Sequence, residues 1–157
     1  MMLRRLAAAV AIWTAAALAA AANCAPTVLD LRSDGAQNRF SVELAVTPAE
    51  RARGLMHRTD LPASSGMLFL IDPPQHAAFW MKNTPLSLDL IFIDAQGVVI
   101  RVTENATPFS EAAMPSGAPV RAVLEVNAGL ADRYRIAEGT QVRHPAFADA
   151  DPVWPCG

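Results

Sequence analysis

Residues 79–85 read Phe-Trp-Met-Lys-Asn-Thr-Pro, and residues 88–94 read Leu-Asp-Leu-Ile-Phe-Ile-Asp. The second run predicts a buried strand, because short apolar runs bounded by turn residues are typical of strands. Trp80 is the only tryptophan far from a terminus, and Lys82 is the only lysine of the chain. An ammonium, an amide and a carboxylate therefore fall within the most apolar part of the sequence and mark it as a candidate site.

The single lysine has two interpretations. The chain has 13 Lys and Arg residues, and all but Lys82 are arginine. Lysine is a compact ammonium whose pKa changes on burial, whereas arginine is a planar fork that stays charged. The functional interpretation is that position 82 requires an ammonium. In the structural interpretation the lysine stem covers apolar surface and its charge pairs with Asp89 or Glu125.

The N-terminal residues have the pattern of a secretory signal. Residues 1–5 are short and basic, residues 6–22 are apolar, and Ala20-Ala21-Ala22 is a small-residue cleavage site. The pattern predicts a signal peptide at residues 1–22 and one domain at residues 23–157, in the periplasm or outside the cell. Two alternatives are an uncleaved membrane anchor and lipidation at Cys24, for which Asn23 is a poor preceding residue.

Charge and cysteine content narrow the functional classes. Without residues 1–22 the chain keeps 11 basic and 15 acidic residues, a net charge of −4, which argues against nucleic acid as a partner. Cys24 and Cys156 lie at the two ends of the mature chain. Export to an oxidising compartment favours a disulfide between them.

The remaining pattern predicts an all-β fold. Short strands are expected at residues 27–31, 40–46, 66–71, 76–81, 88–93, 98–103, 120–126 and 141–144. Residues 72–74, Asp-Pro-Pro, should break the third strand, and residues 105–119 form a loop longer than ordinary connections. Two short helices are expected, at residues 48–53 and 130–136. These elements favour an antiparallel sandwich or barrel, jelly-roll-like.

The start of the first helix has a specific signal. Thr47-Pro48-Ala49-Glu50 matches a capping box, in which the threonine caps the helix and the glutamate binds back to the cap. Gly54 should end this helix after little more than one turn.

Several blocks occur in a characteristic order: Arg51-x-x-Gly54-Leu55-Met56-x-Arg58-x-x-Leu61-Pro62, Gly66-Met67-Leu68-Phe69, Phe79-Trp80-Met81-Lys82-Asn83-Thr84, Leu88-Asp89 with Phe92-Ile93 and Gly97, and Leu124-Glu125-Val126 with Gly129. Over residues 28–144 they resemble the family called domain of unknown function 192. The resemblance implies a β-rich, jelly-roll-like or barrel-like domain, often secreted or membrane-tethered. It implies no established activity. One departure is the turn before Leu88, where the proline stands at position 85.

The main candidate site is polar, and its residues are Arg51, Arg58, Trp80, Lys82, Asn83, Asp89 and Glu125. We expect them to bind a small polar ligand or an exported partner protein in a cleft, without a cofactor. A hydrolytic enzyme is one alternative, with Lys82, Asp89 and Glu125 in acid–base roles. A purely structural network is another, because buried charges must be paired.

Two further candidates rest on soft and aromatic side chains. Met56, Met67 and Met81, with His57 or His76, could bind Cu(I), which thioethers select. Core packing is the better explanation of the three methionines, because each has apolar neighbours. Trp80 with Phe79 and Phe69 could hold a sugar or a peptide. Since strand side chains alternate, one of Phe79 and Trp80 should face inward and the other outward. The sequence has no classical zinc spacing.

Overall fold

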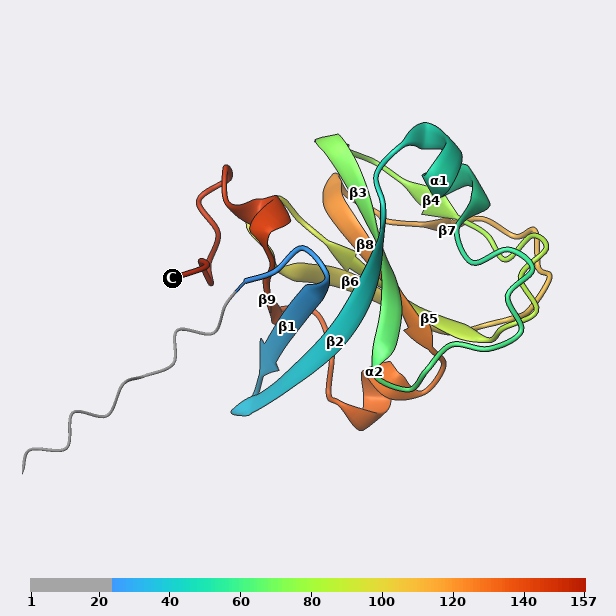
Figure 1. Ribbon diagram of the computed structural model, residues 1–157, viewed down its shortest axis with the longest axis horizontal. Coiled ribbons are helices and arrows are strands. Elements are labelled where there is room, and N and C mark those ends of the chain that lie inside the picture. Colours follow the sequence, from blue (N-terminus) through green and yellow to red (C-terminus); the bar gives the residue numbers. More distant parts are fainter. Residues whose placement is uncertain (1–23) are drawn as a thin grey trace, which may run out of the picture.

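The computed structural model describes residues 24–157, so the predicted signal peptide at residues 1–22 lies outside the described residues. The elements, in chain order, are β1 (Val28–Ser33), β2 (Ala36–Ala45), α1 (Pro48–Arg53), β3 (Ser65–Gln75), β4 (Ala78–Phe79), β5 (Leu88–Ile93), β6 (Val99–Ala106), β7 (Met114–Pro115), β8 (Val120–Asn127), α2 (Leu130–Arg133), β9 (Gln141–Arg143) and the 3₁₀ helix η1 (Pro145–Phe147) (Figure 1). None of the helices in this part of the chain is of a length and apolarity that could cross a bilayer.

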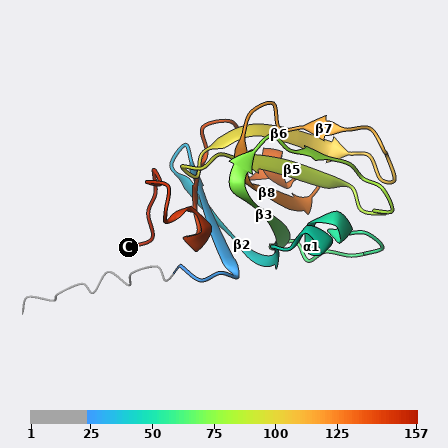
Figure 2. The ribbon, with the colours of Figure 1, turned by 90° about the horizontal axis from the view of Figure 1, so that it is seen from above.

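Seven strands form one curled sheet in the order β6-β5-β8-β3-β2-β1-β9 (Figure 2). Its two edges meet at one point, because Val98 bridges Gln141 and the Val99 N–H donates to the Thr140 carbonyl at 2.9 Å. The sheet therefore curls into a half-barrel whose ends touch. Strands β4 and β7 form a separate two-stranded sheet. The all-β prediction is confirmed.

Helix α1 begins as the capping box predicts. Thr47 Oγ1 accepts from the Glu50 N–H at 3.2 Å, and the Glu50 carboxylate accepts from the Thr47 N–H at 2.8 Å. The helix connects β2 to β3, and these two strands run parallel, with Val42 opposite Gly66. The expectation of an antiparallel sheet is wrong for this pair. Parallel neighbours require a long crossover, and the segment containing α1 supplies it.

The expected break at residues 72–74 is also wrong, because β3 continues to Gln75. Pairing with β8 is regular up to Leu70, shifts in register, and resumes at Gln75. Both prolines lie in the irregular part, where no ladder hydrogen bond is required of them.

The second layer is smaller than the sequence pattern suggests. The strand expected at residues 76–81 is reduced to Ala78 and Phe79, which pair with Pro115 and Met114. The long connection at residues 105–119 is thus partly ordered as β7. Phe79 and Met114, from these two strands, pack against the same apolar cluster as Leu55. Figure 2 shows β7 beside β6, on the side of the sheet away from α1.

An apolar cluster packs against each face of the sheet. The first, inside the curl, includes Leu29, Phe40, Leu68, Ile91, Leu124 and Val126. The second, on the opposite face under α1 and β4, includes Leu55, Met67, Phe69, Met81, Leu90, Phe92 and Val123. Because side chains alternate along β8, Leu124 and Val126 point into the curl and Glu125 points to the second face.

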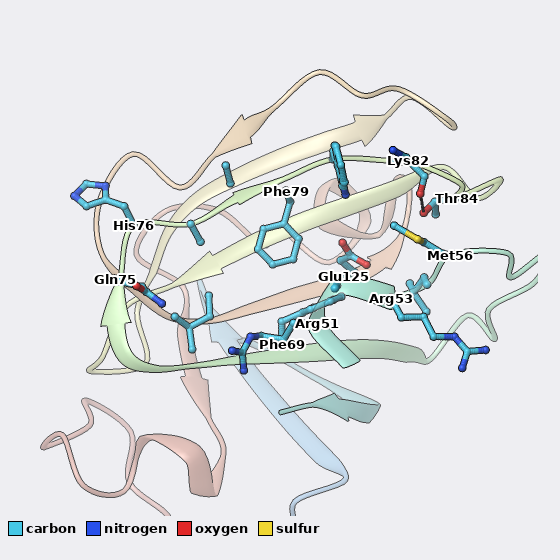
Figure 3. A pocket seen from close by; sticks show the side chains of 17 residues that line it. Arg51, Arg53, Met56, Phe69, Gln75, His76, Phe79, Lys82, Thr84 and Glu125 are labelled. Carbon is cyan, nitrogen blue, oxygen red and sulfur yellow. Dashed lines mark hydrogen bonds between the residues drawn. The ribbon is translucent and has the colours of Figure 1, made fainter. Parts of the chain in front are cut away.

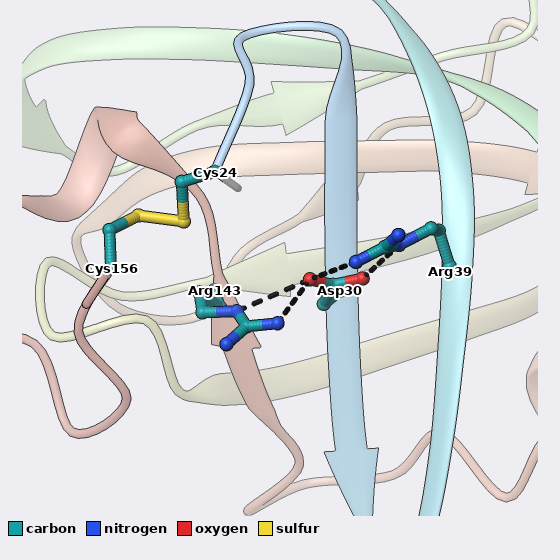
Figure 4. Close-up of polar contacts among 5 residues, drawn as sticks. All are labelled: Cys24, Asp30, Arg39, Arg143 and Cys156. Carbon is teal, nitrogen blue, oxygen red and sulfur yellow. Dashed lines mark hydrogen bonds and ion pairs between the residues drawn. A yellow bond between two sulfur atoms is a disulfide. The ribbon is translucent and has the colours of Figure 1, made fainter. Parts of the chain in front are cut away.

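The two ends of the domain are joined by a disulfide between Cys24 and Cys156, whose Cα atoms are 5.7 Å apart, as predicted (Figure 4). Beside it, Asp30 accepts from the guanidinium groups of Arg39 at 2.6 Å and Arg143 at 2.7 Å. Burial acts to raise the pKa of Asp30, but the two guanidinium groups outweigh it and the pKa is lowered.

The C-terminal tail is held by stacking and capping. The Trp154 ring lies 4.4 Å from the guanidinium carbons of both Arg32 and Arg143. His144 Nδ1 accepts from the Ala146 N–H at 3.1 Å, which leaves Nε2 to donate to the Pro26 carbonyl at 2.8 Å. Burial lowers the pKa of His144, so this imidazole stays neutral.

Candidate functional site

A cavity of about 450 Å³ lies between the second face of the sheet and the layer made by α1 and β4 (Figure 3). Its lining comes from residues 51–56, from Phe69 and Ile71 on β3, from much of residues 75–84, and from Glu125 on β8. A cavity of this volume can hold a small organic molecule.

Glu125 forms part of the floor of this cavity. It stands on β8, directly opposite Met67 on β3 and Leu90 on β5, and these two neighbours are buried and apolar. Only 5% of Glu125 is exposed. The central strand of the sheet therefore presents one carboxyl group to the cavity from an apolar surface.

The carboxyl group of Glu125 has no charged or hydrogen-bonding partner within residues 24–157. Burial raises its pKa to about 8, and no neighbouring cation opposes the shift. Glu125 is therefore mainly protonated at neutral pH. A neutral carboxylic acid can donate a hydrogen bond, and an ionised one here would need a cation.

The walls of the cavity are aromatic. Phe69 and Phe79 meet edge to face at 5.0 Å, and Phe79 meets Phe92 in the same way at 6.1 Å. Gly54 ends α1 with a φ of +47°, and a Cβ atom there would lie 3.0 Å from the Phe69 ring. Glycine thus allows the end of α1 to close tightly over this wall.

Trp80 and Lys82 form the rim. Trp80 is 47% exposed, and the Lys82 ammonium lies 5.0 Å from its ring centre. Lys82 also pairs with Glu111 at 3.6 Å. The expectation that it pairs with Asp89 or Glu125 is therefore wrong, because the side chain stays at the solvent-exposed mouth instead of reaching the floor.

The two predicted arginines have structural partners. Arg51 donates to the carbonyl groups of Val46 and Leu70, the latter at 3.0 Å, and so fastens α1 to the end of β2 and the middle of β3. Arg58 pairs with Glu43 at 2.5 Å and does not line the cavity.

Asp89 and Asn83 also lie apart from the cavity lining. Asp89 is completely buried and accepts from the backbone N–H groups of Asn105 at 2.8 Å and Ala131 at 2.9 Å. Asn83 adopts a φ of +52°, and its carbonyl accepts from the His57 N–H at 2.7 Å. Four of the seven expected site residues, Arg51, Trp80, Lys82 and Glu125, thus line the cavity.

The three methionines of the copper hypothesis do not line the cavity together. Met67 and Met81 are buried in the second core cluster. Met56 alone of the three lines the cavity, and its sulfur lies 4.0 Å from the Asn83 amide nitrogen. The Cu(I) site stays a prediction.

Sequence reasoning missed one neighbour of the site, Glu111. It belongs to the connection at residues 105–119, where no sequence signal indicates which residue meets Lys82. His76 was expected only as a possible partner of the copper-binding methionines, and it lines the cavity from the segment after β3.

The solved structures that are similar to this chain include the following two. A protein of unknown function from Novosphingobium aromaticivorans DSM 12444 is 43% identical, with a TM-score of 0.72 over 73% of this chain and 82% of that one. A proposed transcription regulator from Sinorhizobium meliloti 1021 is 39% identical, with a TM-score of 0.73 over 76% of this chain and 93% of that one. No curated protein matches the chain significantly.

A family model also matches most of the domain. Residues 29–144 match the model of domain of unknown function 192, DUF192, which is described as an uncharacterised ACR. This range contains every strand that frames the cavity. The chain belongs to the DUF192 family.

Proposed function

We propose that this protein is a binding module that holds a small molecule in the cavity above Glu125. The observation that carries the proposal is the carboxyl group of Glu125, a residue that is only 5% exposed, which faces a cavity of about 450 Å³ and has no partner among the described residues. Its oxygen atoms are accessible from the cavity, since none of the fully buried side-chain nitrogen and oxygen atoms of residues 24–157 is unpaired. Buried polar groups normally satisfy their hydrogen bonds within the protein. A ligand would supply the missing partner.

The other buried acids support this reasoning by contrast. Asp30 binds two guanidinium groups, and Asp89 binds two backbone N–H groups. Both are thereby satisfied within the fold. Glu125 is buried to the same degree and lacks such partners, so folding alone does not account for a glutamate at this position.

We propose that binding takes place outside the cytoplasm. The basic and apolar residues 1–22 support export, and the disulfide of Cys24 with Cys156 suits an oxidising compartment. The binding partner would then be a molecule of the periplasm or the medium.

The test is a fragment screen by NMR on residues 24–157, with Trp80→Ala and Trp154→Ala as a matched pair. Both changes delete a tryptophan, but Trp80 lines the cavity and Trp154 stacks on arginines near the disulfide. For fragments that shift cavity resonances, we expect Trp80→Ala to weaken binding about tenfold or more, because a buried aromatic contact is worth 1–2 kcal/mol.

Trp154→Ala should leave the same affinities unchanged within twofold. The proposal is wrong if no fragment perturbs the cavity residues, or if every fragment binds the two variants equally well.

A further inference from the structure

We propose that the ligand of this cavity is an organic cation, an ammonium group that pairs with Glu125 between aromatic walls. This inference rests on the proposed function and names the chemical class of its ligand. It follows from the charges that line the cavity, from the aromatic rings around it, and from its volume.

Within the described part of the chain, none of the cationic side chains that line the cavity is directed at the carboxyl group of Glu125. Besides Glu125, the lining contains four basic side chains. Arg51 and Arg53 come from α1, and His76 and Lys82 come from the segment around β4. Arg51 is used by two backbone carbonyl groups, and Lys82 by Glu111 and Trp80. Arg53 points away from Glu125, and His76 lies at the far end of the cavity (Figure 3).

An anionic ligand would meet Glu125 as a like charge or as a neutral acid, with no cation directed at it from the floor. A cationic ligand would ionise Glu125 and pair with it. Displacing the proton costs little near neutral pH, since the pKa of Glu125 is about 8, and an ion pair in this apolar setting is strong.

The aromatic lining favours the same class. Phe69, Phe79 and Trp80 line the same cavity as Glu125. Figure 3 shows the Phe79 ring beside Glu125. Faces of aromatic rings attract ammonium groups, and a carboxylate beneath such rings completes the recognition of a quaternary ammonium. Lys82 already places an ammonium 5.0 Å from the centre of the Trp80 ring, so this rim accepts the contact.

The experiment compares three probes of nearly the same shape and different charge: tetramethylammonium, the neutral pivalamide and the anion pivalate. Each is titrated into residues 24–157 by NMR at pH 6 and pH 9. Tetramethylammonium has no titratable group, so any change in its affinity with pH comes from the protein.

We expect tetramethylammonium to bind most tightly of the three and roughly 100-fold more tightly at pH 9 than at pH 6, because only the ionised carboxylate pairs with it and the pKa of Glu125 is about 8. Glu125→Gln should abolish both the preference and the pH dependence. Glu43→Gln removes the same charge from a surface ion pair with Arg58 outside the cavity and should retain both. His76→Asn should leave the pH dependence in place, which shows that the titrating group is not this imidazole.

Tighter binding of pivalamide, weakening as the pH rises, would overturn the cationic class and leave a neutral hydrogen-bond acceptor as the ligand of the same cavity. Preference for pivalate would overturn it as well. Binding of tetramethylammonium that survives in Glu125→Gln would show that the cation lies elsewhere. In the first two outcomes the proposed function stands, whereas cavity resonances that no probe or fragment shifts would contradict both.

Discussion

Two buried acids, Asp30 on β1 and Glu125 on β8, have pKa values that are shifted in opposite directions. Asp30 is 6% exposed and Glu125 is 5% exposed. Arg39 and Arg143 bind Asp30, and its pKa is lowered in spite of burial. Glu125 has no such partners in the described chain, and burial alone raises its pKa to about 8. Two acids that are buried to the same degree therefore have pKa shifts of opposite direction, and the charged neighbours determine the direction.

The region around Asp30 is stabilised by its ion pairs. The region around Glu125 contains an acid without such partners among the described residues, which lowers the stability of the fold when it ionises. Near the disulfide, Asp30 is paired with two arginines (Figure 4). The Trp154 ring of the tail stacks against Arg32 and Arg143. Over the outer face of β8, an acid is held in apolar surroundings beside an open space. Uncompensated groups of this kind concentrate at functional sites.

The largest effect is expected from pH on Glu125→Gln. The unfolded carboxyl group loses its proton near pH 4.5 and the folded one near pH 8, so between these values the folded state binds more protons and stability falls as the pH rises. Glutamine does not titrate. The variant should therefore gain about 4 kcal/mol in free energy of unfolding over the wild type between pH 4.5 and pH 9.

Urea denaturation at several pH values measures this difference. A constant difference between the two proteins across the range would show that folding does not raise the pKa of Glu125, and the comparison with Asp30 would then fail.

A smaller effect, without this pH dependence, is expected from Asp30→Asn. The change leaves Arg143, whose side chain is 14% exposed, without its carboxylate, and losing one partner of a largely buried ion pair costs about 3 kcal/mol. Because the pKa of Asp30 is lowered, the loss should be full at pH 5 and above, and should shrink only in acid as the wild type itself loses the ion pair.

The same denaturation series at pH 5, 7 and 9 is the measurement, with Glu43→Gln as the exposed control. Glu43 pairs with Arg58 at the surface, so its loss should cost less than 1 kcal/mol. A strongly pH-dependent loss for Asp30→Asn between pH 5 and pH 9 would contradict the description of this end.

The smallest effect is expected from Lys82→Met. The Lys82–Glu111 pair is 3.6 Å long, with both side chains largely exposed, so thermal unfolding should show a change below about 0.5 kcal/mol. A loss above 2 kcal/mol would mean that the lysine supports the fold from within, as the structural interpretation of the sequence supposed.

Much of the fold could be predicted from local patterns. The capping box at residues 47–50, the apolar run at residues 88–93 and the cysteines near both ends each indicate one structure, and each is observed. The parallel pairing of β2 with β3 was missed, although a strand, a helix and a strand in succession indicate it. The prolines at positions 73 and 74 led to the wrong prediction of a strand break. A strand can contain proline where its neighbour forms no regular ladder, and the pairing of β3 with β8 is irregular at these positions.

The site was harder to predict, because partners distant in sequence determine it. Lys82 stands out because it is the only lysine of the chain, but the rarity of a residue type does not indicate whether its side chain is buried. Asp89 resembles a catalytic or binding residue in the sequence, yet two N–H groups, one from β6 and one from α2, satisfy its carboxylate. Glu125 could be singled out as a polar residue between Leu124 and Val126, whereas its lack of partners follows from the placement of α1 and β4, which no local pattern encodes.

The disulfide gives the domain a single point of attachment. Because Cys24 and Cys156 are covalently joined, a segment attached at either of these two cysteines departs from the same corner, on the side away from α1 and β4 (Figure 1). A tether there leaves the mouth of the cavity unobstructed. An affinity tag, a surface linkage or a lipid at this corner would therefore display the domain with its aromatic rim directed outward.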